Sequence, residues 1–504
     1  MKEGISSKLK NCRMLLGGLV LNVLCVLQFA GCGAVAQDEP GGVASIQEFG
    51  EGGNTQMIYD RRQRPQTLYY NDLVYIVYNG GANTIDPKKG ENTYPHIITY
   101  NTLTKELSEP IKLAEKNGKD QHFTPVIWMD KDDYIHILYG CHNTRPYTHL
   151  VARQPGGIGD SADDWKTLPE FAEAISYPTI YNITGNRQVI YYRGDGHRSY
   201  WIYNITEDNG VTWSAPYMIT DLNNAEDLNI TSETTKEEHR FIDETSSYQS
   251  VCLSKDRNYL HVAFSQYDDN KKNLPEKFKN DRYGTDHNLG IKYNLYYVKV
   301  DLTTHEVRNY DGDLLTTPMD LEYADANCRI WDTDGRGSGK PAFVNVDENG
   351  DPTFIHCLSS DDDLNKYNFW YVRRDGDQWK KTIIADANHS WSSCYSKTRE
   401  SGKLHAYLVR SNDKSYSGWM DSRGGGNLLE EWVSEDKGNT WARVKDLAPK
   451  DSNYEGWRFN CIQPVRDRYG NDIDNLHVFY GWLDPELHLA KAFIADESTT
   501  SKDD

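Results

Sequence analysis

A short sequence pattern occurs seven times along this 504-residue chain. Each copy begins with a turn of Asn, Asp, Ser or Gly residues and continues as alternating apolar residues, which is typical of a half-buried β-strand. The copies start roughly fifty to ninety residues apart, enough for four short strands in each interval. The pattern therefore predicts an all-β fold, a seven-bladed β-propeller of four-stranded antiparallel blades. The copies are Asn71–Tyr78, Asp132–Tyr139, Asn186–Tyr192, Asp256–Phe264, Asn349–Cys357, Ser401–Tyr407 and Asp474–Tyr480.

The last blade has strand-like sequence for only three strands before a polar tail at 496–504. The segment Thr55–Tyr59, which precedes the first blade, is expected to supply the fourth strand. A ring closed in this way has no exposed strand edge. The propeller is therefore expected to span residues 55–495.

The N-terminus has the pattern of an export signal over residues 1–31, with basic residues ahead of an apolar run. Phe29–Cys32 resembles a bacterial lipobox, in which Cys32 becomes the lipidated first residue. Ala34–Ala36 offers an ordinary cleavage site as an alternative, and an uncleaved membrane anchor fits less well because the run is short. We expect an exported protein, either a cell-surface or outer-membrane lipoprotein or a secreted one, with a linker at 32–54.

The chain is acidic, with 75 Asp and Glu against 55 Lys and Arg and a net charge of −20. This charge argues against a nucleic-acid partner and against an anionic membrane surface. Membrane contact is therefore expected only through a lipid anchor. The protein is expected to be a monomer. The net charge does not exclude an anionic substrate, because a local cluster of His, Arg and Tyr can still bind a carboxylate or sulfate.

Six cysteines follow the signal region, and none forms a Cys-x-x-Cys pair. Most lie in strand-like sequence, so buried thiols are the first interpretation, a disulfide the second and metal ligation the third. They are Cys141, Cys252, Cys328, Cys357, Cys394 and Cys461.

Features that recur from blade to blade are expected to be structural. Thr206–Trp213 and Ser434–Trp441 are near copies of one another and match the Asp-box, a hairpin turn shaped by Asp and Gly. Four histidines share one strand position in their blades and are interpreted in the same way. They are His136, His261, His405 and His477.

Strand direction selects the candidate site residues. The innermost and second strands of a blade are antiparallel, so the start of the first and the end of the second lie on the same face. In blades two to four, innermost strands start near His122, Tyr177 and Tyr248, and second strands end near His142 and Arg193. We expect these five side chains to gather on one face.

The two tyrosines and the arginine of this set also have a structural interpretation. Tyr177 precedes Pro178 and could pack in a turn, Arg193 could pair with Asp195, and Tyr248 could simply fill a strand. His122 and His142 lie outside the repeated histidine position, which favours a functional role for them.

The set suits cleavage of a uronate-containing polysaccharide by elimination. This reaction removes the proton on C5, next to the carboxylate, and expels the oxygen on C4. An Arg or a protonated His would neutralise the carboxylate, and Tyr or His would serve as base and acid. Nearby cations would help a tyrosine, whose free pKa is about 10, to act as the base.

At these residues the chain resembles the seven-bladed propeller ulvan lyases, polysaccharide lyase families 24 and 25, and the wider BNR-4 propeller group. The motifs that carry the resemblance are Gln121–Pro125, Tyr139–His142, Ser176–Pro178 and Tyr191–Asp195. The resemblance implies ulvan, an anionic algal polymer of sulfated rhamnose and uronate, as the substrate, and a 4,5-unsaturated uronate as the product. By this likeness His122, His142 and Tyr177 would be catalytic, and Arg193, with Tyr248, would bind the uronate.

The resemblance implies no cofactor for catalysis but allows a structural zinc, because some members hold one in Cys and His ligands. The available ligands here are His287, Cys328 and Cys357, with His356 next to the last of them. Their separation in the sequence is wide, and no pairing follows from it.

Two alternatives stay open from the sequence, and a third is disfavoured. Related propellers act on the rhamnose-glucuronate caps of arabinogalactan, as lyases or as rhamnosidases. A non-catalytic carbohydrate-binding propeller would have aromatic platforms without a convergent His, Tyr and Arg set. A sialidase would need an arginine triad and an early Arg-Ile-Pro motif, which we do not find.

Overall fold

The structure is a computed structural model. It describes residues 45–50, 57–59, 63–81, 93–115, 121–142, 146–194, 200–222, 245–268, 279–280, 285–286, 292–361, 363, 366–399, 401–412, 424–483 and 490–498. The chain divides into two units, Met1–Pro40 and Gly41–Asp504. The first unit, with the expected signal peptide and Cys32, lies outside the described residues. Among the residues described, no helix has the length and hydropathy needed to cross a membrane.

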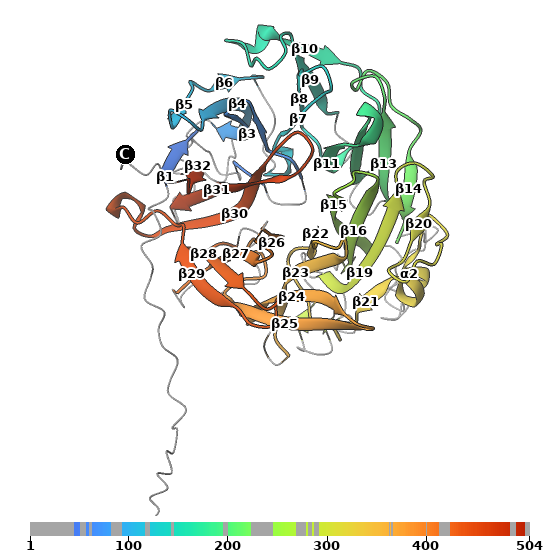
Figure 1. The fold of residues 1–504 in the computed structure, drawn as a ribbon. Coiled ribbons are helices and arrows are strands. Elements are labelled where there is room, and N and C mark those ends of the chain that lie inside the picture. Colours follow the sequence, from blue (N-terminus) through green and yellow to red (C-terminus); the bar gives the residue numbers. More distant parts are fainter. Residues whose placement is uncertain are drawn as a thin grey trace, which may run out of the picture. The chain divides into compact units, whose positions relative to one another are not determined.

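The second unit is a seven-bladed β-propeller, as the repeat predicts (Figure 1). Its blades are antiparallel sheets, and in each the strands follow one another outward from the centre. Blades one to three are formed by β2 (Thr67–Tyr70), β3 (Leu73–Gly81), β4 (Thr93–Asn101), β5 (Glu106–Leu107) and β6 (Ile111–Lys112); β7 (Val126–Met129), β8 (Ile135–Tyr139), β9 (Thr148–Ala152) and β10 (Trp165–Leu168); and β11 (Ser176–Asn182), β12 (Gln188–Arg193), β13 (Trp201–Thr206) and β14 (Tyr217–Thr220).

Blade four has an extra strand and contains a long insertion between β16 and β19, which carries the short pair β17 (Lys279–Asn280) and β18 (Thr285–Asp286). One short helix, α2 (Leu321–Asn327), precedes the extra strand. Blades four to seven are formed by β15 (Thr245–Leu253), β16 (Tyr259–Asp268), β19 (Lys292–Asp301), β20 (Val307–Arg308) and β21 (Arg329–Trp331); β22 (Phe343–Val346), β23 (Pro352–Ser359), β24 (Tyr367–Asp375) and β25 (Gln378–Ala387); β26 (Cys394–Thr398), β27 (Leu404–Arg410), β28 (Leu428–Ser434) and β29 (Ala442–Asp446); and β30 (Trp457–Arg466), β31 (Asp472–Leu483), β32 (Lys491–Asp496) and β1 (Ser45–Phe49).

All seven copies of the repeated pattern lie in the second strand of a blade. β3, β8, β12, β16, β23, β27 and β31 each pair with an innermost strand on one side and a third strand on the other. Because these strands are sandwiched, most of their side chains are buried. The repeat therefore corresponds to a largely buried strand of each blade.

An N-terminal strand closes the ring, as expected, but it is not the segment predicted. β1 pairs antiparallel with β32, from Ser45 opposite Asp496 to Phe49 opposite Ala492. The prediction that Thr55–Tyr59 forms this strand is wrong, because Met57–Tyr59 are buried but outside any ladder. The propeller thus begins within the stretch expected to be a linker.

Chain segments fill the centre of the ring. Gln63–Gln66 runs beside blade three, where the Arg64 amide donates to the Pro178 carbonyl (2.9 Å) and the Ile180 amide donates to the Arg64 carbonyl (3.1 Å). The tip of the β30–β31 hairpin reaches inward (Figure 1), and its Arg468 pairs with Asp133 of blade two (2.6 Å). The central segments therefore tie blades together.

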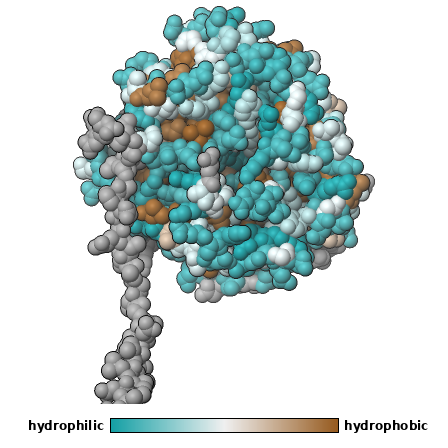
Figure 2. Space-filling view, in the orientation of Figure 1, coloured by the Kyte–Doolittle hydropathy of each residue, from teal (hydrophilic) through white to brown (hydrophobic). Residues whose placement is uncertain are grey.

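The surface is consistent with a solvated acidic protein. The face in Figure 2 is mostly hydrophilic, with hydrophobic residues in small separate patches. The large exposed apolar side chains come from widely separated positions. They are Leu103, Val211, Leu314, Ile383, Val444 and Tyr469.

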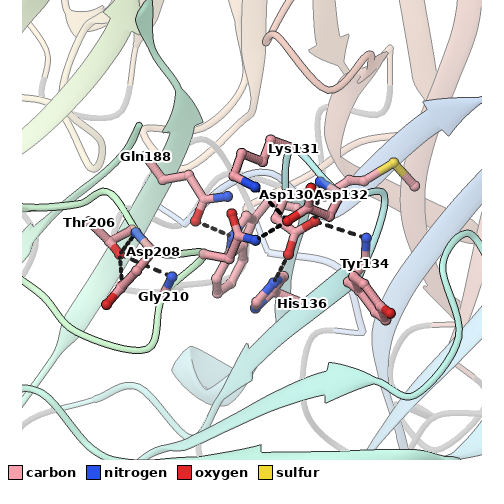
Figure 3. Close-up of polar contacts among 12 residues, drawn as sticks. Asp130, Lys131, Asp132, Tyr134, His136, Gln188, Thr206, Asp208 and Gly210 are labelled. Carbon is pink, nitrogen blue, oxygen red and sulfur yellow. Dashed lines mark hydrogen bonds and ion pairs between the residues drawn. The ribbon is translucent and has the colours of Figure 1, made fainter. Parts of the chain in front are cut away.

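The repeated histidines lie in buried structural networks, as predicted. The ring of His136 contacts Asp130 Oδ2 through Nε2 (3.1 Å) and His149 Nε2 through Nδ1 (3.0 Å). Figure 3 shows this contact beside the first Asp-box, in which the Gly210 amide donates to the Thr206 hydroxyl (3.0 Å). These contacts stabilise turns and blade packing, which is a structural role.

His261 makes folding sensitive to acid. Burial lowers its pKa to about 4, with Lys299 adding to the shift and Asp256 opposing it. The unfolded chain has a histidine pKa of about 6.5, so between about pH 6.5 and 4 the unfolded state binds a proton that the folded state does not. Acidification through this window therefore lowers the free energy of unfolding.

We expect His261→Asn to flatten the dependence of stability on pH, because it removes this titration. Within the window the residue contributes a slope of roughly 1.4 kcal/mol per pH unit. Urea unfolding at about pH 7, 5.5 and 4.5 measures the slope in both proteins. The same slope in the variant and the wild type would contradict the assignment, even if the variant is less stable throughout.

Candidate active site

Strand polarity brings the five predicted residues together on one face. His122 lies in the 3-10 turn Gln121–Phe123 ahead of β7, and His142 follows β8. Tyr177 and Tyr248 lie near the starts of β11 and β15, and Arg193 ends β12. The ring and hydroxyl contacts below join all five, so blades two, three and four share one site.

Tyr177 is at the centre of this cluster. Its hydroxyl lies 3.4 Å from His142 Nε2 and 3.1 Å from the Tyr248 hydroxyl. Its ring stacks between Tyr59 and Trp201, with centroids 6.4 and 6.3 Å away and both planes inclined by 15°. The ring is therefore held in one orientation, with its hydroxyl directed at the two possible proton partners.

The backbone at Tyr177 is strained. Its φ is +56°, in the left-handed region, although the next residue is a proline, which favours extended backbone. A β-bulge lies here, because the register between β11 and β12 shifts between Ser176 and Thr179. Strain of this kind costs about 1–3 kcal/mol and persists only where the surroundings enforce it. The bulge turns the tyrosine toward the site.

His122 and His142 form a stacked pair with ring centroids 4.0 Å apart and planes inclined by 17°. Two imidazolium charges at about 4 Å would repel by about 4 kcal/mol at an effective dielectric constant of about 20. The close contact therefore disfavours positive charge on both rings at once, and it places two groups that can exchange a proton side by side.

Arg193 supplies a buried positive charge behind the tyrosines. It is fully buried, and its guanidinium carbon lies 4.8 Å from the Tyr177 ring centroid and 5.5 Å from that of Tyr248. Burial acts to lower its pKa, but attraction to Tyr248 and Tyr177 outweighs it, and the pKa is raised above its usual value. Asp195, the alternative partner of Arg193, lies outside the described residues.

Lys292 is a second buried cation, and the sequence did not point to it. Its ammonium lies 4.6 Å from the ring centroids of both Tyr248 and Tyr267 and 4.8 Å from that of Trp391. It starts β19, the third strand of blade four, directly after the longest insertion. The signal available was strand polarity, because a third strand starts on the face where the second strand ends.

Tyr59 lies at this site, although the sequence predicts it in the strand that closes the ring. It packs edge-on against His122, with centroids 5.3 Å apart, and is fully buried. Trp201 was not singled out, although it pairs in register with Arg193. Both residues support the orientation of Tyr177.

The cysteines do not form the expected zinc site. Cys328 donates toward the Met319 sulfur (3.5 Å) and Cys357 toward the His389 carbonyl (3.5 Å), and the two thiols lie in different hydrophobic clusters. His287 lies outside the described residues. Within the described part of the chain, no group of three or more His, Cys, Asp or Glu could hold a metal. Cys328 and Cys357 therefore do not fit one shared zinc.

The first interpretation of the cysteines is supported. The six described cysteines are free thiols, and five of them are buried, with Cys252 partly so. Burial raises the pKa of the Cys328 thiol to about 12, which keeps it protonated near neutral pH.

The fold and the site together define a β-propeller that carries a buried Tyr, His and Arg constellation on one face. Residues 97–387, more than half of the chain, match the model of the BNR repeat-containing family. The chain belongs to this family, and the match confirms the resemblance to the BNR-4 propeller group.

Two curated relatives extend the likeness. An ulvan lyase of Nonlabens ulvanivorans is 22% identical over 409 residues, which are 73% of this chain and 76% of that protein. A protein of Pseudoalteromonas sp. (strain PLSV) named Ulvan Lyase-PL25 is 22% identical over 484 residues, which are 86% of this chain and 88% of that protein.

A solved structure has the same fold. It is a polysaccharide lyase PL25 ulvan lyase bound to -[GlcA(1-4)Rha3S]-, and it superimposes with a TM-score of 0.66 at 18% identity. The match covers 90% of this chain and 96% of that one.

Proposed function

We propose that this protein is a polysaccharide lyase that cleaves ulvan by β-elimination at the uronate. The observation that carries the proposal is the Tyr177 hydroxyl, which lies 3.4 Å from His142 Nε2 and 3.1 Å from the Tyr248 hydroxyl, beside the buried Arg193. Proton-transfer groups and a fixed cation are what the elimination needs. Relatives named ulvan lyases, which align with most of the chain, support the choice of substrate.

The elimination begins at C5 of the uronate. A base removes the C5 proton, the electron pair forms the C4–C5 double bond, and the C4–oxygen bond breaks. The leaving oxygen takes a proton from an acid. His122, His142 and Tyr177 supply base and acid, since their side chains are in mutual contact and can hold and return the proton.

Positive charge makes the C5 proton acidic by stabilising charge that builds up on the carboxylate. Arg193 and Lys292 supply it. Both are buried beside the tyrosine pair, where low dielectric strengthens their field. Tyr248, between the two cations, lies beside the position where the uronate is bound.

The reaction is tested by its product. Incubation with ulvan is expected to raise the ultraviolet absorbance of an unsaturated uronate, and Tyr177→Phe, His122→Ala and Arg193→Ala are each expected to lower the rate by at least about a hundredfold. Circular dichroism of each variant checks that the propeller is intact. New reducing ends without the chromophore would indicate hydrolysis and contradict the lyase mechanism, and binding without cleavage would indicate a non-catalytic propeller.

Lys292→Met tests the second cation. Loss of its charge beside Tyr248 is expected to lower kcat about tenfold, because negative charge that develops in the site during the reaction is then less stabilised. Lys292→Arg should restore part of the rate. The control is Lys299→Met, a lysine on the same strand whose ammonium lies 5.1 Å from the Tyr259 ring, at the other end of β19. Equal effects of the two Met variants would exclude the role.

Export through a lipobox at Cys32 remains part of the proposal and rests on the N-terminal sequence pattern. Mass spectrometry of the mature protein from its native membrane is expected to find a lipid-modified N-terminal Cys32. A mature chain that starts after Ala36 would show ordinary signal cleavage instead.

A further inference from the structure

A cavity of about 410 Å³ lies between blades six and seven, away from the site described above. Its size is within the range of roughly 300–1,000 Å³ found for small-ligand sites. It lies between the end of β27, the start of β28 and the turn that leads into β30. The lining includes Ser411, Asn427, Lys450, Tyr454, Trp457 and Arg458.

The cavity opens on the same face as the active site. Ser411 follows the second strand of blade six, and Trp457 and Arg458 begin the innermost strand of blade seven. Ends of second strands and starts of innermost strands share a face, which is the rule that gathers Tyr177 and Arg193. A ligand on that face can therefore meet both places.

The position of the cavity in the ring is also significant. The active site is centred on blade three, and in a ring of seven equal blades the point opposite blade three falls between blades six and seven. A linear polymer that crosses the face through the centre from Tyr177 therefore leaves it at this cavity. A polymer that follows the rim would not.

Contacts connect the two places. Lys292, beside Tyr248, also lies 4.8 Å from the ring of Trp391, at the start of blade six. Next to Trp391 runs Gly424–Gly426, where a side chain on Gly424 would lie 2.5 Å from the Trp391 carbonyl carbon. The Gly426 amide then donates to the Phe459 carbonyl (3.1 Å), on the cavity wall. Packed residues thus connect the site and the cavity, and their closest approach requires glycine.

The lining has the chemistry of a sugar site rather than of a simple anion site. Tyr454 and Trp457 form an edge-to-face pair with centroids 5.3 Å apart, a surface for the apolar face of a sugar ring. Lys450 and Arg458 can bind a sulfate or carboxylate, and Asp451 and Glu455 can accept from hydroxyls. A bare anion would gain nothing from these carboxylates.

We propose that this cavity is a distal subsite that binds an anionic sugar of the polymer several residues from the bond being cleaved. The inference rests on the proposed function, because it assigns the cavity to the same polysaccharide. It gives the enzyme a second binding site for long chains, which would raise its affinity for the polymer above that for short fragments.

Arg458→Met and Lys450→Ala test the subsite with two substrates, long ulvan and an ulvan tetrasaccharide. Each variant is expected to raise KM for the polymer about fivefold to tenfold and to leave kcat unchanged. Kinetics on the tetrasaccharide should not change, because it is too short to reach the cavity from Tyr177. Lys450 is well exposed, with 63% of its side chain accessible, so its replacement leaves the fold intact.

Lys403→Ala is the matched control. Lys403 is also an exposed lysine of blade six, paired with Glu435 as Lys450 is paired with Asp446, but it precedes β27 and lies on the opposite face. It should leave both substrates unaffected. An unchanged KM for the polymer in both cavity variants, or an equal loss on polymer and tetrasaccharide, would overturn the subsite.

Affinity electrophoresis in ulvan gels separates this proposal from the proposed function. In a Tyr177→Phe background, Arg458→Met is expected to weaken the apparent affinity for ulvan, measured from the retardation of the protein in the gel, by at least about fivefold. If the wild type makes no unsaturated uronate but this loss of retardation is observed, the lyase assignment fails and the sugar site stands. If the wild type is a lyase and retardation is unchanged, the subsite fails alone.

Discussion

The antiparallel pairing of the first two strands in each blade is the constraint on which the site depends. It places the start of one strand and the end of the next on a single face. In blade three the register is direct, since Ser176 pairs with Arg193 and Arg193 pairs with Trp201. The tyrosine after Ser176 therefore has a guanidinium on one side and an indole beside it. Neighbouring blades repeat this geometry and bring in His142 and Tyr248.

The strained backbone at Tyr177 is held by the filled centre of the ring. The Arg64 amide donates to the carbonyl of Pro178, and the Arg64 carbonyl accepts from the Ile180 amide. These two bonds flank Thr179, at the end of the bulge, and give this part of β11 the partners that a strand neighbour would provide. Closure of the ring and filling of its centre thus contribute to the site itself, because they hold Tyr177 in a conformation that an isolated hairpin would relax.

Strand order and the five site residues could be predicted because second strands are buried on both sides and carry a strong pattern. The closing strand could not. Only Phe49 of β1 is buried, so Ser45–Phe49 has no apolar alternation, whereas Met57–Tyr59 look strand-like because they pack in the ring. Lys292 follows a long insertion, and its contacts depend on where that insertion returns. Nor does the sequence reveal that Cys328 and Cys357, two of the candidate zinc ligands, lie in separate hydrophobic clusters.

Charge placement explains how an acidic protein can bind an acidic polymer. The net charge of −20 belongs to the whole chain, and screening weakens exposed charges more than about 10 Å away in physiological salt. Arg193 and Lys292 are instead fully buried under aromatic rings, at most 1% exposed, so their field is screened little. A uronate bound over Tyr177 and Tyr248 therefore meets two local cations, while the distant surface charge affects mainly the rate of encounter.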